Sequence, residues 1–222
     1  MAKRRPVRNL LALAVLTVVL QRPMHPYEMA SVLRARGKDR DMPIKWGSLY
    51  TVVRNLEKHG LLEATASLRH GGRPERTVYR ITAAGRAEVD DWVRELVSVP
   101  EREVPRFEAG LSVIGALGPD EAEDLLRRRL TRLEEEIAAQ RADLDADLQQ
   151  VPRLFLIESE YDLAIREAEA AWVRSLLGEL ADGSFPGLEQ WREWRTSGRV
   201  PPELADLAER GADPDHPTGE EP

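Results

Sequence analysis

The sequence of 222 residues contains no cysteine. Disulfide bonds, thiolate metal sites and cysteine nucleophiles are therefore excluded. The four histidines show no metal-ligand spacing, and there is no GxSxG motif that would carry a serine nucleophile. The many carboxylates lie among arginines on predicted helix faces, where they are most simply solvated or paired charges. We therefore expect no enzymatic activity and no cofactor.

Aromatic residues are also scarce, at 5%, whereas charged residues make up 32%. This composition favours a helix-rich protein over a large sandwich or barrel. The main apolar run, Leu10 to Leu20, includes Thr17 and is too short to span a bilayer of about 30 Å. It follows a basic stretch, as in a signal peptide, but no small-x-small cleavage site comes after it. We expect a buried helix in a cytoplasmic protein without a membrane partner, and a signal peptide is the alternative.

The charge is divided by segment. Residues 1–86 carry 17 basic and 6 acidic residues, a net +11, whereas residues 87–222 carry 15 and 33, a net −18. A basic first third joined to an acidic remainder indicates a polyanion-binding domain followed by a module with another task. The alternative is that both segments merely have solvated surfaces whose net charges are of opposite sign.

Two further helices are predicted after the apolar run. Pro26 suits the first turn of a helix that continues from Tyr27 to Arg36 and ends at Gly37. The next segment, WGSLYTVVRNLEKHG, carries an apolar stripe of Leu49, Val52, Val53 and Leu56. Its opposite face has Gly47, Thr51, Arg54 and Lys58, flanked by Tyr50 and Asn55. A helix in a DNA major groove needs this division, because one face anchors it and the other meets bases and phosphates.

A β-hairpin should follow, because apolar and polar residues alternate over 62–68 and 78–81 around the loop RHGGRPER. Three interpretations of this loop compete: a phosphate-cradling enzyme loop, a solvated turn, or a DNA-contacting wing. A phosphate loop should lead into a helix, whereas this one leads into a strand. Arg69, Arg73 and Arg76 could reach phosphates or a minor groove. The order of three helices and a hairpin is that of a winged helix-turn-helix.

In these segments the chain resembles the PadR family of transcriptional regulators. The resemblance rests on PMHPYEMASVLRARG at 23–37, GSLYTVVRNLEKHGLLE at 47–63 and GGRPERTVYRITAAGR at 71–86, with an acidic helical region after them. It implies a homodimeric, usually repressing protein that binds a palindromic operator in double-stranded DNA. It also implies that Ser48, Tyr50 and Thr51 contact DNA, with Arg73 at the wing tip. Arg54 and Lys58 join this set from the helical pattern. Pro26 and Trp46 depart from the family pattern.

The acidic remainder predicts two long helices. The first begins after Gly118 and Pro119 and carries a heptad-like seam: Leu126, Leu130, Leu133, Ile137, Leu144 and Leu148. The second follows Pro152 and carries Ile157, Tyr161, Ile165, Ala168, Trp172, Leu176 and Leu180. We expect these helices, including Trp172, to pair across a dimer. An antiparallel hairpin within one chain is the alternative.

The expected fold class is mainly α, with a winged helix-turn-helix and two-stranded wing at residues 1–86 and a long-helix dimerisation domain at 87–183. Residues 184–222 form an acidic, partly disordered tail rich in proline and glycine, in which Trp191 and Trp194 suggest one short docked turn. Relatives of the family can bind flat aromatic effectors near the dimer interface, which points to Trp92 and Trp172 as cavity residues, unless both are simply core. The competing function is a winged-helix module that binds proteins instead of DNA.

Overall fold

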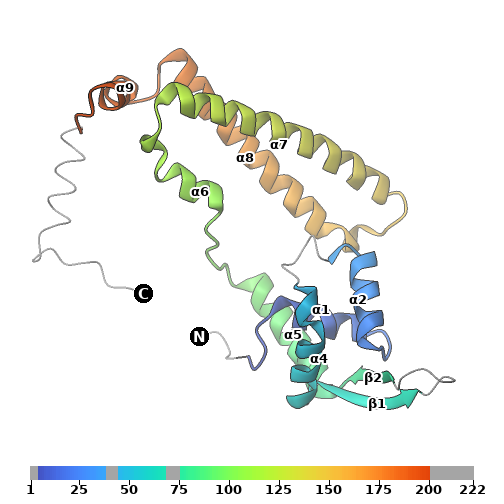
Figure 1. The fold of residues 1–222 in the computed structure, drawn as a ribbon. Helices are drawn as coiled ribbons and strands as arrows, with labels where there is room; N and C mark the ends of the chain where they lie inside the picture. Colours follow the sequence, from blue (N-terminus) through green and yellow to red (C-terminus); the bar gives the residue numbers. More distant parts are fainter. Residues whose placement is uncertain (1–4, 39–44, 69–75, 201–222) are drawn as a thin grey trace, which may run out of the picture. The chain divides into compact units, whose positions relative to one another are not determined.

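The computed structural model describes residues 5–38, 45–68 and 76–200. The chain divides into two compact units, Met1–Arg102 and Glu103–Pro222 (Figure 1). The predicted fold class is confirmed: these described residues are mainly helical, with one antiparallel sheet of two strands and long helices after it. None of the described helices is long and apolar enough to cross a membrane.

The described residues of the first unit form seven elements. In chain order they are α1 (Leu10–Val19), α2 (Pro26–Ala35), the short 3-10 helix η1 (Trp46–Ser48) that leads into α4 (Leu49–Lys58), strands β1 (Leu62–Leu68) and β2 (Arg76–Ile81), and α5 (Ala83–Ser98). This is the order of a winged helix.

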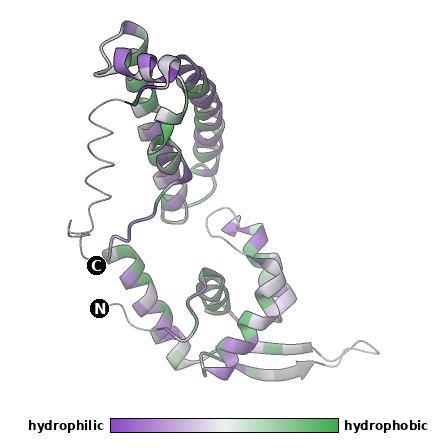
Figure 2. Ribbon diagram, turned by 60° about the vertical axis from the view of Figure 1, so that its left-hand side comes forward, coloured by the Kyte–Doolittle hydropathy of each residue, from purple (hydrophilic) through white to green (hydrophobic). Residues whose placement is uncertain are grey.

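The apolar run forms the central helix of this unit. Eight of the ten residues of α1 are buried, and hydrophobic colour covers it in Figure 2. The side chain of Asn9 caps the helix by accepting a hydrogen bond from the amide of Leu11 at 2.8 Å. Helices α2, α4 and α5 pack around α1. The expected buried helix is therefore present.

Strands β1 and β2 form an antiparallel hairpin, and β2 also pairs with the backbone just before α2. Leu62 pairs with Ile81 and Ala64 with Tyr79, and the register shifts between Ala64 and Ala66. The backbone of Met24, just before α2, exchanges two hydrogen bonds of 3.0 Å with Tyr79. The start of α2 is thereby tied to the outer side of β2.

Helix α5 belongs to the first unit, which therefore extends beyond the predicted boundary at residue 86. Thr82 caps it as expected, accepting from the amide of Gly85 at 3.0 Å. Gly85 sits against the turn before β1: a Cβ atom there would lie 2.2 Å from the carbonyl oxygen of Leu61. Val89 and Trp92 are buried in the same core as α1.

The second unit is entirely helical in its described part. It contains α6 (Arg106–Leu111), η2 (Ile114–Ala116), α7 (Pro119–Asp147), η3 (Arg153–Phe155), α8 (Ile157–Asp182) and α9 (Leu188–Ser197). Helices α7 and α8 form a long antiparallel hairpin (Figure 1). The predicted start of α7 at Pro119 is confirmed, with Gly118 as its N-cap.

The single turn expected around Trp191 and Trp194 is a ten-residue helix, α9. The indole nitrogen of Trp191 donates a hydrogen bond of 2.8 Å to the carbonyl of Leu117. Leu188 is buried in the apolar cluster shared with α7 and α8, and the ring of Trp194 lies against Gly115. The helix thus docks on the second unit. The part of the tail expected to be disordered lies mainly outside the described residues.

Candidate nucleic-acid interface

Helix α4 separates an anchoring face from a free face. Leu49, Val52, Val53 and Leu56 are buried, as the pattern predicted. Tyr50, Thr51, Arg54 and Lys58 are exposed, and Tyr50 leaves 54% of its surface accessible. Among the described residues no carboxylate forms an ion pair with Arg54 or Lys58. Both cations are therefore available to an external anion.

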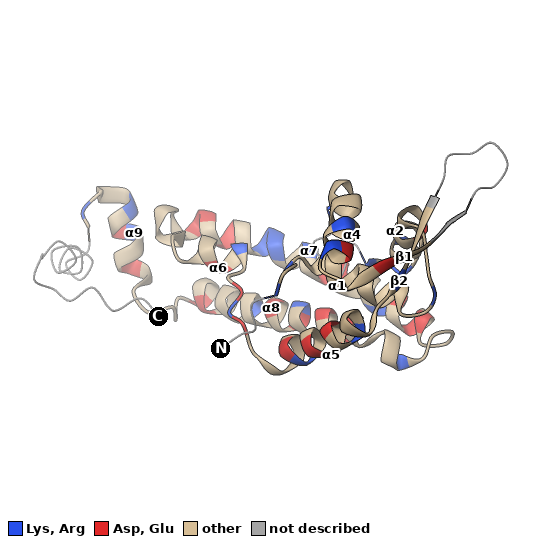
Figure 3. Cartoon of the chain, turned by 90° about the horizontal axis from the view of Figure 1, so that it is seen from below, with Lys and Arg blue, Asp and Glu red and all other residues tan. Residues whose placement is uncertain are grey.

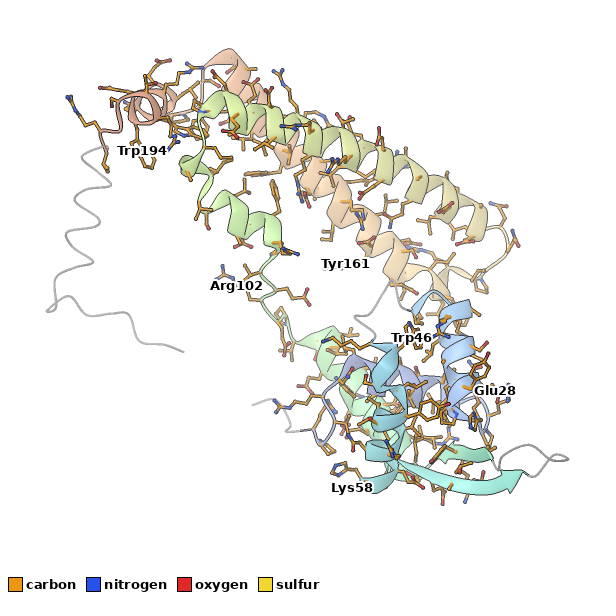
Figure 4. All side chains as sticks on the ribbon, viewed as in Figure 1. Glu28, Trp46, Lys58, Arg102, Tyr161 and Trp194 are labelled. Atoms are coloured by element: carbon orange, nitrogen blue, oxygen red, sulfur yellow. The ribbon has the colours of Figure 1, made fainter. Side chains whose placement is uncertain are left out.

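The start of α4 is held by two contacts. The hydroxyl of Ser48 donates to the carbonyl of Lys45 at 2.7 Å, and the side chain is half-buried. The guanidinium of Arg34 on α2 lies 4.4 Å from the ring centre of Trp46. Trp46 and Lys58 stand at the two ends of α4 (Figure 4). The cation–π contact therefore fixes the entry to this helix against α2.

A hollow of about 400 Å³ adjoins the free face of α4. Its lining comes from the start of α2, from α4 and from β2: His25, Pro26, Tyr50, Val53, Arg54, Thr77 and Tyr79. Burial raises the pKa of the Tyr79 phenol, and the nearby Glu57 carboxylate raises it further, so this group stays neutral at ordinary pH. Sequence reasoning missed His25, Thr77 and Tyr79, because only the pairing of Met24 with Tyr79 brings these segments together.

The wing is described at its base. Arg69 and Arg73 lie outside the described residues, as does the side chain of Arg76, whose backbone begins β2. Arg80, further along β2, forms a 2.8 Å ion pair with Glu63 across the hairpin. The charge of Arg80 is therefore neutralised locally, and any excess positive charge of the wing comes from the three predicted arginines.

The seam on α7 packs within the chain. Leu126, Leu133, Ile137 and Leu144 are buried in clusters with α8 residues, and Leu130 is half-buried between them. The alternative interpretation, an antiparallel helical hairpin within one chain, therefore accounts for this face. These apolar residues, predicted as dimer contacts, are covered by α8 of the same chain. Helix α8 keeps a second, exposed apolar stripe of Ile157, Tyr161, Ile165 and Trp172. Tyr161 is labelled on α8 in Figure 4.

The two tryptophans predicted to share an effector cavity belong to different units. Trp92 is buried in the core of the first unit, with the guanidinium of Arg5 5.1 Å from its ring centre. Trp172 is half exposed and packs edge-on against Phe107, with ring centres 6.2 Å apart. Neither residue lines a hollow found in its own unit. In the part of the chain that the structure describes, no group of three His, Asp or Glu side chains could hold a metal ion.

The sequence and the fold of this chain are similar to those of known proteins. The family model described as "Transcriptional regulator PadR-like family" matches residues 15–91, from α1 through the hairpin into α5. An uncharacterised protein of Lysinibacillus sphaericus is 31% identical over 96 residues, which cover 43% of this chain and 85% of that protein. This chain belongs to the PadR-like family.

Two other relatives show how far the likeness extends. A probable transcriptional regulator of Mycobacterium tuberculosis is 33% identical over 89 residues, 38% of this PadR-like chain, and the match spans only 44% of that relative. Bacillus subtilis PadR in complex with operator DNA has a similar fold, with a TM-score of 0.64 at 18% identity, covering 78% of this chain and 99% of that one. The same protein in complex with p-coumaric acid gives a TM-score of 0.65 at 17% identity. The predicted resemblance to the PadR family is confirmed.

Proposed function

We propose that this PadR-like chain is a sequence-specific DNA-binding regulator of transcription, acting in the cytoplasm by binding and not by catalysis. The observation that carries the proposal is the free face of α4, with Thr51, Arg54 and Lys58 exposed on a helix whose other face is buried. Such a face supplies donors for base edges and cations for phosphates. A protein-binding module would be expected to expose an apolar or acidic face there.

The proposed contacts to DNA come from two elements. Tyr50, Thr51, Arg54 and Lys58 on α4, with Ser48 just before it, approach the major groove, and the wing arginines Arg69, Arg73 and Arg76 approach phosphates or the minor groove. Bacillus subtilis PadR, which shares the fold, has been solved with operator DNA. The hydroxyl of Ser48 already donates to Lys45, so Ser48 is expected to act mainly by holding the start of the helix.

We further propose that the regulator is a homodimer, a repressor, and is released by a small effector. A two-fold axis suits a palindromic operator. Because the α7 seam is filled by α8 of the same chain, the dimer contact is assigned to the exposed stripe of α8. An effector role has support from the p-coumaric acid complex of the Bacillus subtilis protein.

The test of DNA binding is fluorescence anisotropy with a duplex from upstream of the protein's own gene and a scrambled duplex, at several salt concentrations. Specific affinity should fall by roughly 10³ to 10⁵ between about 50 and 200 mM salt if about 6 to 10 phosphates are contacted. Arg54→Ala should weaken specific binding by about tenfold or more. The control is Arg94→Ala, since Arg94 is exposed on α5 and paired with Asp91.

The outcomes of this anisotropy experiment distinguish a DNA-binding regulator from a module that binds a protein partner. Equal, weak binding of both duplexes would mean that the operator lies elsewhere, and a genome-wide selection of bound fragments would then locate it. No binding of either duplex at low salt would reject DNA binding in favour of a protein partner. An unchanged affinity in Arg54→Ala, with specific binding by the parent, would remove Arg54 from the contact set.

A further inference from the structure

We propose that the acidic segment 203–209 of this chain, which lies outside the described residues, docks in a hollow of the second unit. The hollow, of about 560 Å³, is bounded by α6, η2 and α7, with two residues from α8. Its apolar lining includes Phe107, Leu111, Ile114, Leu125 and Leu126. Leu125 leaves 40% of its surface exposed, so the described residues cover this lining only in part. Apolar side chains that cover such a lining gain free energy by leaving water.

The rim of the hollow has more positive charge than its own carboxylates neutralise. Two of the four arginines that line it are paired with glutamates of the same hollow: Arg129 with Glu169 at 2.5 Å and Arg166 with Glu136 at 2.6 Å. The other two, Arg128 and Arg132, lie one helical turn apart on α7. In the described part of the chain neither forms an ion pair, although acidic and basic residues are interleaved along α7 and α8 (Figure 3). Two positive charges therefore remain for an acidic partner.

The acidic segment, ELADLAE, has the matching chemistry. Glu203, Asp206 and Glu209 are acidic, and no basic residue lies between them. Leu204 and Leu207 are three residues apart, a spacing that places two side chains on the same side of a helix. Carboxylates match the donor forks of the guanidinium groups at the rim, and the leucines match the apolar lining. One short segment thus satisfies both parts of the hollow.

Helix α9 brings the chain to the hollow. The indole nitrogen of Trp191 donates a hydrogen bond of 2.8 Å to the carbonyl of Leu117, and Leu117 lines the hollow. The ring of Trp194 lies against Gly115, in η2 at the same end. The second half of α9 is therefore fixed at the η2 end of the hollow, and the acidic segment follows this helix in the sequence.

The remaining distance is within reach of the chain. The last described residue, Val200, follows Trp194 by six positions. Residues 201–209 can span up to about 30 Å when extended. The hollow runs along α7 from Ala122 to Glu136, which is a length of about 21 Å at 1.5 Å per residue. The segment is therefore long enough to lie along the hollow, and once docked it closes the hollow from within the chain.

The test is disulfide trapping in the full chain, which has no native cysteine to compete. Leu125→Cys is combined in turn with Leu204→Cys, Leu207→Cys and Ala208→Cys, so that three registers of the segment are sampled. At least one pair should form an intrachain disulfide about tenfold faster than its control, because docking holds the two thiols close together. The control replaces Leu125→Cys by Thr131→Cys, since Thr131 is exposed on α7 within the same stretch and does not line the hollow.

The rim charges are tested in the pair that is trapped fastest. Arg128→Glu combined with Arg132→Glu should slow trapping by about fivefold or more, because the rim then repels the carboxylates of the segment. Adding Glu203→Lys and Asp206→Lys to this variant should restore the trapping rate. Arg127→Glu is the matched control, because Arg127 pairs with Glu123 and does not line the hollow. Circular dichroism of each variant verifies that the helices are retained.

Three results would overturn the proposal. Equal trapping rates with Leu125→Cys and Thr131→Cys would mean that the segment meets α7 without a preferred side. Trapping that the arginine reversal leaves unchanged would remove the charge match. Disulfide-linked dimers in place of the intrachain product, identified by mass under non-reducing conditions, would make the segment of a second copy the occupant. The docking concerns the second unit alone and is measured without DNA, so a failure to bind DNA would overturn only the proposed function.

Discussion

Arg5 is the residue with the least expected position. It precedes α1, is 7% exposed, and its guanidinium donates to Glu88 at 2.5 Å and also to Glu95, both on α5. Burial works against its charge, but the hydrogen bonds to the two carboxylates outweigh burial, so the pKa of Arg5 is raised above its ordinary value. The same guanidinium covers the ring of Trp92. Arg5 therefore fastens the chain before α1 to α5.

Removing this guanidinium should cost far more than removing an exposed one. We expect Arg5→Ala to lower the free energy of unfolding by about 3 kcal/mol, because it removes a buried guanidinium that pairs with two carboxylates of α5 and covers the ring of Trp92. Arg22→Ala, which breaks the exposed pair with Glu28, should leave it unchanged within error. Urea unfolding followed by circular dichroism measures both. Equal effects would show that Arg5 contributes no more than a surface charge.

Single residues were predictable where their role is local. Pro26 and Thr82 were placed correctly because a helix start depends on the residues next to it. Arg5 was read only as part of a basic leader-like stretch, because its partners lie 83 and 90 residues away. The hollow beside α4 was not predicted for the same reason, because the segments that line it come together only when Met24 pairs with Tyr79.

At the scale of elements, α8 has two apolar faces and only one is covered. Leu163, Ala170, Val173, Leu177 and Leu180 are buried against the rest of the second unit. Ile157, Tyr161, Ile165 and Trp172, spaced by four, four and seven residues, leave 52, 68, 51 and 49% of their surfaces exposed. A helix that is apolar on both sides needs a second neighbour. A second copy is the proposed neighbour, because an interface about a two-fold axis is made by the same patch on both chains.

The stripe can be tested by placing charge on it. Tyr161→Glu combined with Ile165→Glu should convert the dimer to monomers, since two carboxylates per chain would be buried without partners. Size-exclusion chromatography with light scattering measures the mass. Ala138→Glu is the control, because Ala138 is exposed on α7 outside the stripe. A dimer that survives the double substitution would place the interface elsewhere.

The sequence predicted both long helices and the seam on α7, and it favoured a partner chain as the neighbour of this seam, whereas the structure packs the buried seam residues against α8 of the same chain. Leu133 and Ile137 recur at the spacing that suits packing on any helix, whether from the same chain or another. Only the short connection around Pro152, which folds α8 back on α7, decides in favour of the same chain. The apolar periodicity of a helix shows that one of its faces is covered, but it does not show which neighbour covers that face.

For the whole molecule, the charge division has a consequence for binding. The +11 of residues 1–86 attracts DNA, and the −18 of residues 87–222 repels it. Repulsion between separated charges is screened within about 10 Å at 0.1 M salt, so it mainly restricts which surface can face the duplex. Only the α4 and wing surface should therefore approach the phosphates, and an acidic protein can still bind DNA in one orientation.

A dimer that approaches DNA in one orientation should leave a two-fold footprint. Hydroxyl-radical footprinting on the operator found by anisotropy should show two protected patches, symmetric about the palindrome, with centres about one helical turn apart or a multiple of it. Inserting about five base pairs at the palindrome centre should abolish the paired pattern, because it turns one half-site to the opposite side of the duplex. The Tyr161→Glu, Ile165→Glu variant should protect either half weakly and independently, since each monomer then binds without its partner. A single asymmetric patch with the parent protein would mean that one chain contacts the site, and the assignment of the α8 stripe to DNA-bound dimers would fail with it.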